Sequence, residues 1–325
     1  MPQPKIVLTR RIPDAGMDLI LERFRPEIWM NELPPGRGEL LGMVRSCEGL
    51  LCLLTDHVDG EVMDAAGSGL KVISTMSVGV DHIDVQEATR RGIPVGNTPG
   101  VLTEATADHT FALMLAAARR IPEAERFLRA GKWVTWSPNL LLGVDLWGAT
   151  LGIVGFGRIG QAVARRAGGF NMKVLCCSPH EVADADARKV DLDTLLGESD
   201  IVSMHVPLTS STRHMVDARF LSKMKPTAIL VNTSRGGVVD QTALHEALKS
   251  GRIFASALDV TEPEPVSMDN PLLKLENCVI VPHLGSASKA TRDNMAMMAA
   301  HNLIAGISGL PLPDCVNREV YKPTS

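Results

Sequence analysis

Three side chains able to do chemistry follow strand-like runs in the second half of the chain. Arg235 stands in LVNTSRGGVVD, Glu264 in ALDVTEPEP and His283 in VIVPHLGSAS. A guanidinium holds carboxylate or carbonyl oxygens in a planar fork, and an imidazole transfers protons near neutral pH. Taken singly, each residue also has a structural explanation, such as a surface ion pair, a solvated loop acid or a helix cap. Their joint position at equivalent ends of neighbouring strands favours an active site.

A glycine-rich loop precedes these motifs. TLGIVGFGRIGQAVARRA carries Gly155, Gly157 and Gly160 between a β-branched apolar run and a helical stretch. In such a βα unit the first glycine permits a tight turn, the second admits a pyrophosphate, and the third lets helix pack on strand. The backbone amides of Arg158 and Ile159, at the helix start, would face the anion. This context favours dinucleotide binding over a purely structural turn.

The second strand of that unit bears on which dinucleotide binds. It ends in KVLCCSPHEV, with Ser178 where an Asp or Glu is usual, followed by Pro179, His180 and Glu181. A carboxylate there bonds the ribose 2′-hydroxyl of NAD and repels the 2′-phosphate of NADP. Ser178 removes that repulsion, while the charges of His180 and Glu181 oppose each other. We expect NADP(H) to be slightly favoured, with NAD(H) possible.

Strand-like and helical runs alternate along the whole chain, which predicts parallel α/β sheets. From residue 150, six apolar runs with helical spacers form a complete doubly wound domain. The first hundred residues show another alternation, and after His283 the chain returns to a helix at 287–307. We therefore expect two Rossmann-like domains: a discontinuous substrate-binding domain of residues 1–100 plus 286–325, and a dinucleotide-binding domain of residues 101–285.

Composition bounds the classes of protein that are possible. The 325 residues are 45% apolar and 22% charged with net charge −4, which is typical of a globular protein and gives no nucleic-acid footprint. Apolar runs stop well short of the ~20 residues that span a bilayer, and no signal-peptide core is apparent. Six cysteines form no C-x-x-C pair, which indicates buried thiols in the cytoplasm rather than a disulfide frame or metal site.

The segment KWVTWSPNLLLGVDLWG (132–148) breaks the alternation and holds three of the four tryptophans. It is either a loop packed on its own domain or an arm that reaches a second subunit. Aromatic enrichment favours the arm.

Together these motifs resemble the D-isomer-specific 2-hydroxyacid dehydrogenase family over nearly the whole chain. The glycine loop, HVPLTSST, NTSRGGVVD, LDVTEPEP and PHLGSAS stand in the family's order. The segments LLCLLTDHVD, LKVISTMSVGVDHID and TPGVLTEATADHTFALML look most like its glyoxylate/hydroxypyruvate reductases. The resemblance implies NAD(P)H-dependent reduction of small 2-oxo acids to D-2-hydroxy acids. It also implies a homodimer through the dinucleotide domain.

The resemblance assigns a catalytic role to three residues of this sequence. Arg235 would hold the substrate's carboxylate and carbonyl oxygens. His283 would protonate the carbonyl oxygen while hydride arrives from nicotinamide C4, and Glu264, rather than Glu262, would support the imidazolium.

Further residues receive binding roles from the same resemblance. Substrate contacts fall on the backbone amides of Val78 and Gly79, on Leu53 as an apolar wall, and on Ser286, for which a capping role is equally suitable. Cofactor contacts fall on Leu102, Thr106, Pro207, Thr212, Thr233, Asp259 and His283. No metal site is expected, and His57, His82 and His109 are expected to be structural or exposed.

Other activities of this scaffold remain as alternatives. Phosphite dehydrogenases carry a Lys before the glycine that here is Gly79, and this chain has Val78. Formate dehydrogenases have a Gln before the catalytic His region, which is not visible here. A dinucleotide-gated corepressor is a different class, disfavoured by STMSVGVD and by the lack of long disordered tails. NADP-preferring relatives usually have an Arg where Pro179 stands, which weakens the NADP(H) expectation.

Overall fold

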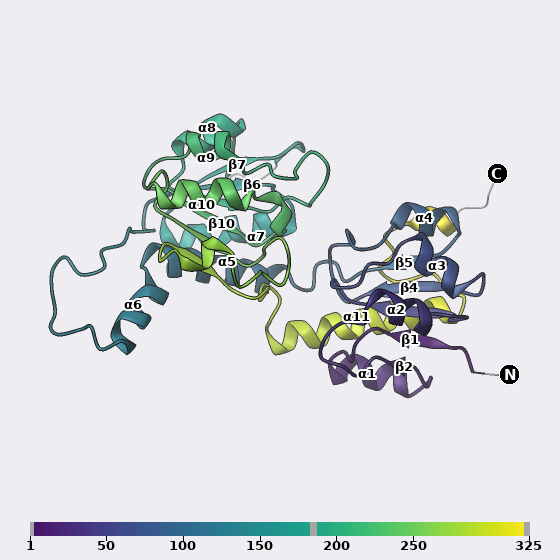
Figure 1. Cartoon of the computed structure of the whole chain (residues 1–325). Coiled ribbons are helices and arrows are strands. Elements are labelled where there is room, and N and C mark those ends of the chain that lie inside the picture. The colour runs from purple at the N-terminus through teal and green to yellow at the C-terminus, as the bar shows by residue number, and fades with distance from the viewer. Residues whose placement is uncertain (1–2, 183–186, 322–325) are drawn as a thin grey trace. The chain divides into compact units, whose positions relative to one another are not determined.

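The computed structural model describes residues 3–182 and 187–321 and divides the chain into two compact units (Figure 1). Unit 1 comprises Met1–Leu102 and Ala287–Ser325, and unit 2 comprises Thr103–Ser286. Unit 1 is therefore built from both ends of the chain.

Unit 1 contains a five-stranded sheet in the order β2-β1-β3-β4-β5, and all its pairings are parallel. This is a doubly wound order of the flavodoxin type. Helices flank the sheet, and the last of them returns from the C-terminal part of the chain. The bounds are β1 Ile6–Leu8, α1 Asp14–Leu21, β2 Glu27–Ile28, α2 Arg37–Met43, β3 Gly49–Cys52, α3 Gly60–Ala66, β4 Val72–Thr75, α4 Val85–Arg90, β5 Val95–Gly96 and α11 Lys289–Ile307.

Both faces of this sheet are buried, which is why its strands are continuous apolar runs rather than alternating ones. Leu51 lies in a cluster with residues of α1 and α11, whereas its neighbour Leu50 lies in a cluster with residues of α2 and α3. Successive side chains of a strand point to opposite faces, so one run serves two cores.

Unit 2 contains a seven-stranded parallel sheet in the order β12-β11-β10-β9-β6-β7-β8, which is the Rossmann order with one added strand. The bounds of its main elements are α5 Thr103–Ala118, α6 Ile121–Arg129, β6 Thr150–Val154, α7 Arg158–Ala167, β7 Lys173–Cys177, β8 Ala187–Lys189, α8 Leu192–Glu198, β9 Ile201–Met204, α9 Ala218–Lys223, β10 Ile229–Asn232, α10 Gln241–Lys249, β11 Ala255–Leu258 and β12 Cys278–Ile280.

Six of these strands match the six predicted runs. The seventh, β8, was missed because it is a three-residue edge strand in which Arg188 and Lys189 are exposed. Ile229 and Val231 of β10 face α5 and α7, while Leu230 faces the cluster that includes α9 and α10. Unit 2 thus also has a core on each face of its sheet.

The strand order reverses between β6 and β9, because the chain proceeds from β6 towards one edge and from β9 towards the other. Ligands of open α/β sheets bind outside the carboxyl ends of the strands at such a point. The glycine loop follows β6, so it lies beside this switch point.

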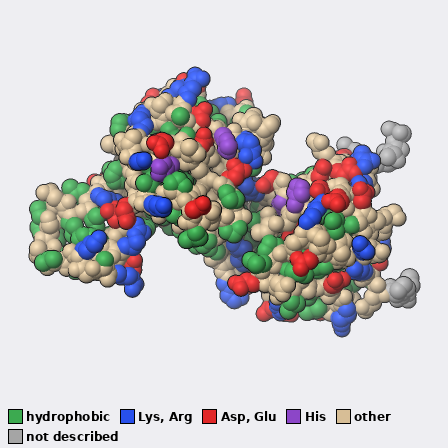
Figure 2. Space-filling model, in the orientation of Figure 1, with side chains coloured by type: hydrophobic (Ala, Val, Ile, Leu, Met, Phe, Trp, Pro, Cys, Tyr) green, Lys and Arg blue, Asp and Glu red, His purple; other side chains and the backbone are tan. Residues whose placement is uncertain are grey.

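Helix α6 and the loop 132–148 project from the rest of unit 2 (Figure 1). Helix α6 has no buried residue. Val134 is 93% exposed, Trp136 75% and Trp147 70%, and Figure 2 shows hydrophobic side chains on the outside of this projection. The end of the segment packs onto unit 2, where Leu146 is 4% exposed and the Val144 amide donates to the Ala118 carbonyl at 2.9 Å, so both interpretations stay open.

Candidate active site

His283 and Glu264 form a hydrogen-bonded pair in unit 2. Nδ1 of His283 lies 2.9 Å from Oε1 of Glu264, with side-chain exposures of 26% and 33%. A carboxylate can only accept, so Nδ1 carries the proton and donates it to Glu264. The other ring nitrogen, Nε2, is left to act on a ligand.

The loop that bears His283 is clamped by Asp259, which follows β11. The His283 amide donates to the Asp259 carbonyl at 2.9 Å, and the Leu284 and Gly285 amides donate to its carboxylate at 2.6 and 2.9 Å. His283 has φ = 53°, in the left-handed region that non-glycine residues seldom adopt. Three hydrogen bonds to one residue hold this strained conformation.

His109 of α5 is a further partner of Asp259. Its Nε2 lies 3.0 Å from Oδ1 of the carboxylate, which is 1% exposed. Burial alone would raise the pKa of Asp259, but the hydrogen bonds from His109 and the Leu284 amide lower it below its usual range. The carboxylate therefore stays charged in the interior, where it continues to hold the His283 loop.

Two threonines of the predicted nicotinamide region lie in the same neighbourhood. The Thr110 hydroxyl donates to the Thr106 carbonyl at 2.8 Å, so the 3.0 Å contact between Thr110 and Thr233 has the Thr233 hydroxyl as donor. Thr106 lies near Gly285, where an added Cβ would come within 3.5 Å of its methyl group. Thr106, Thr233 and Asp259 are thus brought together beside the His283 loop.

Arg235 follows β10 in a turn stabilised by Asn232. The buried Asn232 side chain accepts from the Ser234 amide at 3.0 Å and donates to the Arg235 carbonyl at 2.8 Å. Gly236 touches the next loop so closely that a Cβ there would lie 1.8 Å from the Thr261 carbonyl oxygen. Only glycine allows this approach, which places the Arg235 turn against the loop after β11.

Glu262 and Glu264 have separate partners. Glu262 lies 3.0 Å from Arg213 and 3.2 Å from His214, away from the His283 pair. The family resemblance assigned the histidine partner to Glu264 rather than Glu262, and the contacts of the two acids agree with that assignment.

The glycine loop has the features of an anion site. Gly155 adopts φ = +93°, and a Cβ there would meet the His205 carbonyl at 2.6 Å. Gly157 is the N-cap of α7 without any side-chain cap, whereas six other helices are capped by Asp or Ser side chains. An added Cβ at Gly157 meets nothing within 4 Å. The amides of the first turn, which belong to Arg158, Ile159 and Gly160, thus lie at the positive end of a helix that has no side-chain cap.

The residues expected to contact the adenine half also follow strand ends. The Ser178 hydroxyl, after β7, accepts from the His180 amide at 3.2 Å, with Pro179 between them. Lys189 of β8 donates from Nζ to the His180 carbonyl at 2.9 Å. After β9, the Thr212 hydroxyl donates to the Pro207 carbonyl at 2.6 Å and closes that loop.

In unit 1, the predicted substrate residues lie at and after the ends of β3 and β4. Neither the Val78 nor the Gly79 amide has a hydrogen-bond acceptor in the described part of the chain. Leu53 packs against the cluster that also includes Leu102, and its amide donates to the Asp56 carboxylate at 2.7 Å. Burial raises the pKa of Asp56, partly offset by that bond and one from Thr9. Ser286, by the division into units, belongs to unit 2 and is buried.

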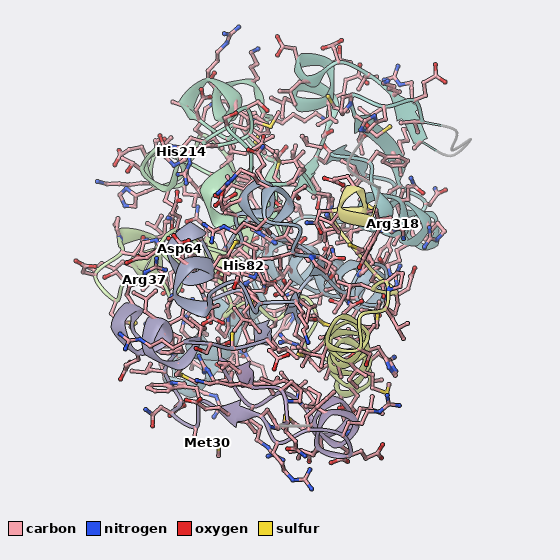
Figure 3. The ribbon with its side chains drawn as sticks, turned by 90° about the vertical axis from the view of Figure 1, so that its right-hand side faces the viewer. Met30, Arg37, Asp64, His82, His214 and Arg318 are labelled. Atoms are coloured by element: carbon pink, nitrogen blue, oxygen red, sulfur yellow. The ribbon has the colours of Figure 1, made fainter. Side chains whose placement is uncertain are left out.

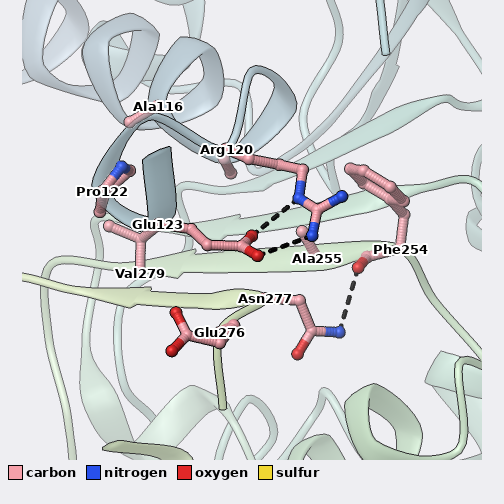
Figure 4. Close-up of a pocket in the computed structure, with 10 residues that line it drawn as sticks. Ala116, Arg120, Pro122, Glu123, Phe254, Ala255, Glu276, Asn277 and Val279 are labelled. Carbon is pink, nitrogen blue, oxygen red and sulfur yellow. Dashed lines mark hydrogen bonds and ion pairs between the residues drawn. The ribbon is translucent and has the colours of Figure 1, made fainter. Parts of the chain in front are cut away.

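A separate pocket of about 330 Å³ lies near the other ends of the strands. It is lined by the end of α5, the start of α6 and the residues before or at the start of β11 and β12 (Figure 4). Two of the lining residues, Arg120 and Glu123, form an ion pair at 2.7 Å. It is distinct from the His283 site, because the strands are parallel and His283 follows their carboxyl ends.

Within the described residues there is no cluster of three or more potential metal ligands, and no helix is long and apolar enough to cross a bilayer.

Several of these residues were missed from sequence. His109 was expected to be structural or exposed; its hydrogen bond to Asp259 is a structural role, but the sequence did not reveal that this partner holds the His283 loop. Thr106, His109 and Thr110 are spaced i, i+3 and i+4 and therefore share one face of the helix. This spacing could have placed His109 beside the predicted nicotinamide residues. No sequence pattern placed Lys189 near the turn after β7, because β8 was not recognised as a strand.

Comparison with known proteins agrees with this arrangement. The model of the D-isomer specific 2-hydroxyacid dehydrogenase NAD-binding domain matches residues 111–285. Glyoxylate reductases of Korarchaeum cryptofilum (strain OPF8) and Thermococcus litoralis are 53% and 50% identical, each match covering 98% of both chains.

Solved structures share the fold. A protein from Thermus thermophilus gives a TM-score of 0.92 at 47% identity, over 96% of this chain and 99% of that one. An NADPH-dependent glyoxylate/hydroxypyruvate reductase from Sinorhizobium meliloti, in complex with NADP and malonate, gives 0.86 at 32% over the whole of both. The chain therefore belongs to the D-isomer-specific 2-hydroxyacid dehydrogenase family and is an oxidoreductase.

Proposed function

We propose that this protein reduces glyoxylate, and with it hydroxypyruvate, to the corresponding 2-hydroxy acid. The observation that carries the proposal is the His283–Glu264 pair, which lies at the same carboxyl edge of the parallel sheet as a loop suited to a dinucleotide. The names of the relatives support glyoxylate as a substrate. The name of the Sinorhizobium meliloti enzyme extends that support to hydroxypyruvate.

A bound reduced nicotinamide dinucleotide supplies the hydride. His283 supplies the proton. Its Nδ1–H stays hydrogen-bonded to Glu264, and Nε2–H of the imidazolium donates to the substrate's carbonyl oxygen as negative charge develops there. The carboxylate of Glu264 stabilises the imidazolium until the proton leaves. In the oxidation direction, neutral His283 accepts the hydroxyl proton at Nε2.

Arg235 and two backbone amides are proposed to bind the substrate. The guanidinium binds oxygens of the carboxylate and the carbonyl, and this polarises the carbonyl for reduction. The amides of Val78 and Gly79 bind the carboxylate, a role supported by their lack of an acceptor in the described residues. We propose Leu53 as the apolar wall and Ser286 as a partner for the 3-hydroxyl of hydroxypyruvate.

We propose NADP(H) as the preferred cofactor. The first turn of α7, with Gly155, Gly157 and Gly160, would hold the pyrophosphate. The absence of a carboxylate at Ser178 admits a 2′-phosphate, and the ammonium of Lys189, bonded to the same turn through His180, adds positive charge. Pro207 and Thr212 would contact the adenine half, and Leu102, Thr106, Thr233 and Asp259 the nicotinamide half.

We propose a homodimer in which the projecting segment, α6 with 132–148, packs on a second copy. The support is the size of its exposed apolar side chains, because Trp133, Val134, Trp136, Leu142 and Trp147 are all more than half exposed. No disulfide joins the six cysteines, all of which lie in the described part of the chain, and this supports a reducing compartment such as the cytoplasm.

A turnover assay tests the proposed function. The purified chain should oxidise NADPH when glyoxylate is added, and more slowly oxidise NADH. Dinucleotide binding without oxidation of either cofactor, with glyoxylate or hydroxypyruvate present, would exclude it and favour a binding protein.

A further inference from the structure

Three consecutive carbonyl groups are anchored in the loop after β4. The Ser77 carbonyl accepts from the Thr98 amide at 2.9 Å, and the Val78 carbonyl accepts from Nδ2 of Asn97 at 2.8 Å. The Gly79 carbonyl accepts from the Ser77 hydroxyl at 2.7 Å. Each of these peptide groups is thus held from its carbonyl side by unit 1 itself.

Anchoring a carbonyl also sets the direction of the next residue's amide. In a planar trans peptide group, the N–H points away from the C=O of the preceding residue. Thr98 therefore sets the direction of the Val78 N–H, and Asn97 sets that of the Gly79 N–H. These are the two amides that lack acceptors in the described residues.

We propose that Asn97 is a positioning residue that aims the Gly79 amide at the carboxylate of the substrate. This inference rests on the proposed function, in which Val78 and Gly79 bind that carboxylate. Of the two anchors, Thr98 acts through its backbone, so Asn97 supplies the side chain that can be altered without moving the strand.

Asn97 is itself fixed in place. Its amide donates to the Asp314 carbonyl at 3.1 Å, and its carbonyl accepts from Nδ2 of Asn302 at 2.9 Å. Asn302 in turn accepts from the Asp314 amide at 3.0 Å, so α11 and the segment after it hold the end of β5. The backbone of Asn97 is thus fixed in position. The orientation of its side-chain amide is fixed as well, because a carbonyl oxygen can bond only to the Nδ2 side.

The other side of the loop has an ordered chain of donors. The Ser77 hydroxyl gives its one proton to the Gly79 carbonyl, so in its 2.9 Å contact with Thr75 the Thr75 hydroxyl must donate. The 3.1 Å contact between Thr75 and His82 then requires a proton on Nε2 of His82, a residue labelled in Figure 3. Loss of the Asn97 bond would leave this chain intact, so it frees one peptide group rather than the whole loop.

Steady-state kinetics of Asn97→Ala and Asn97→Asp test the inference. The Asp variant keeps the size of the side chain but replaces the donor by an acceptor that repels the Val78 carbonyl, so it tests the role even where Asn97→Ala folds poorly. We expect KM for glyoxylate and Ki for oxalate to rise about tenfold in Asn97→Ala and further in Asn97→Asp. The Kd for NADPH and the Tm should stay near those of the wild type.

Asn317→Ala is the matched control. Asn317 also anchors β5, accepting from the Val95 amide at 2.8 Å and donating to the Ile93 carbonyl at 3.0 Å, but it does not touch residues 77–79. It should lower Tm and leave KM and Ki unchanged.

An unchanged oxalate Ki in Asn97→Asp would overturn the inference, as would an equal rise in Asn317→Ala. Both results leave the proposed function standing if the wild type reduces glyoxylate. A wild type without turnover would instead contradict the proposed function.

Discussion

His283 and Glu264 lie nineteen residues apart in sequence, yet Nδ1 of one is 2.9 Å from Oε1 of the other. The pair joins the loops that follow β12 and β11, two adjacent strands of the sheet. Because Glu264 accepts the hydrogen bond from Nδ1–H, the contact fixes which ring nitrogen faces a ligand. Asp259 holds the left-handed backbone conformation of His283, and this conformation fixes the direction in which the imidazole leaves the backbone.

The uncapped start of α7 gives a prediction in which affinity and stability separate. Gly157→Asp would place a carboxylate at the N-cap, where it stabilises a helix but repels a pyrophosphate. There is room for the side chain, since a Cβ meets nothing within 4 Å. We expect Tm to be unchanged or higher and the Kd for NADPH to rise at least tenfold. Gly157→Asn is the uncharged control of the same size: an equal rise in both variants would indicate a steric effect, and a wild-type Kd in Gly157→Asp would refute an anion site there.

Lys189 should contribute to the choice between the two cofactors. Its ammonium bonds the His180 carbonyl in the turn after β7, so Lys189→Glu should repel a 2′-phosphate. We expect the ratio of kcat/KM for NADPH to that for NADH to fall about tenfold. Arg188→Glu is a matched control, because Arg188 pairs with Glu198 at 2.5 Å instead. An equal fall in both variants would indicate a general charge effect, not a contact.

The projecting segment should hold two copies together. The wild type should sediment at twice the mass of the 35.0 kDa chain. Trp136→Asp should produce monomers with little change in the stability of each chain, since the side chain is 75% exposed. Met268→Asp alters a residue that is 85% exposed elsewhere and should remain dimeric. A monomeric wild type at micromolar concentration would contradict the proposal.

His205 predicts a loss of stability in mild acid. Burial lowers its pKa from the ordinary 6.5 to about 4, although its ring nitrogen Nε2 keeps a 2.8 Å contact with the Ser203 hydroxyl. Between pH 6.5 and 4 the unfolded chain binds a proton that the folded chain does not, so stability falls as the pH falls.

Comparison of the wild type with His205→Gln isolates this effect from the titration of acids. From about pH 7.5 to about pH 5, the wild type should lose about 1–2 kcal/mol more free energy of unfolding than the variant, allowing for partial solvent contact of the half-buried ring. Urea titrations at the two pH values measure the difference. Identical pH dependence would mean that His205 titrates normally in the folded state.

Much of the fold follows from patterns within short segments. Continuous apolar runs marked the strands near Leu50 and Leu230, because both faces of each sheet are buried. The two strands that sequence did not reveal, β2 and β8, are short edge strands whose residues are largely exposed, so they lack that apolar signal.

The site divides in a similar way. Arg235, Glu264 and His283 could be named because each sits in a motif after a strand. Asn97 and His109 could not, because their importance comes from contacts with Val78 and Asp259, which lie 19 and 150 residues away. Such pairings depend on how strands and helices pack, which no local pattern encodes. Lys189 likewise acquires its place only from β8 pairing with β7.

The central claim is that His283 protonates the substrate carbonyl during NADPH-dependent reduction of glyoxylate. The most direct test is kcat for the wild type, Glu264→Gln and His283→Asn, with Kd for NADPH measured in parallel. Asparagine suits the test because it tolerates the left-handed conformation at φ = 53°. The account predicts an about 10²–10⁴-fold fall in kcat for His283→Asn, a smaller fall for Glu264→Gln and unchanged Kd. A His283→Asn variant with wild-type kcat would contradict it.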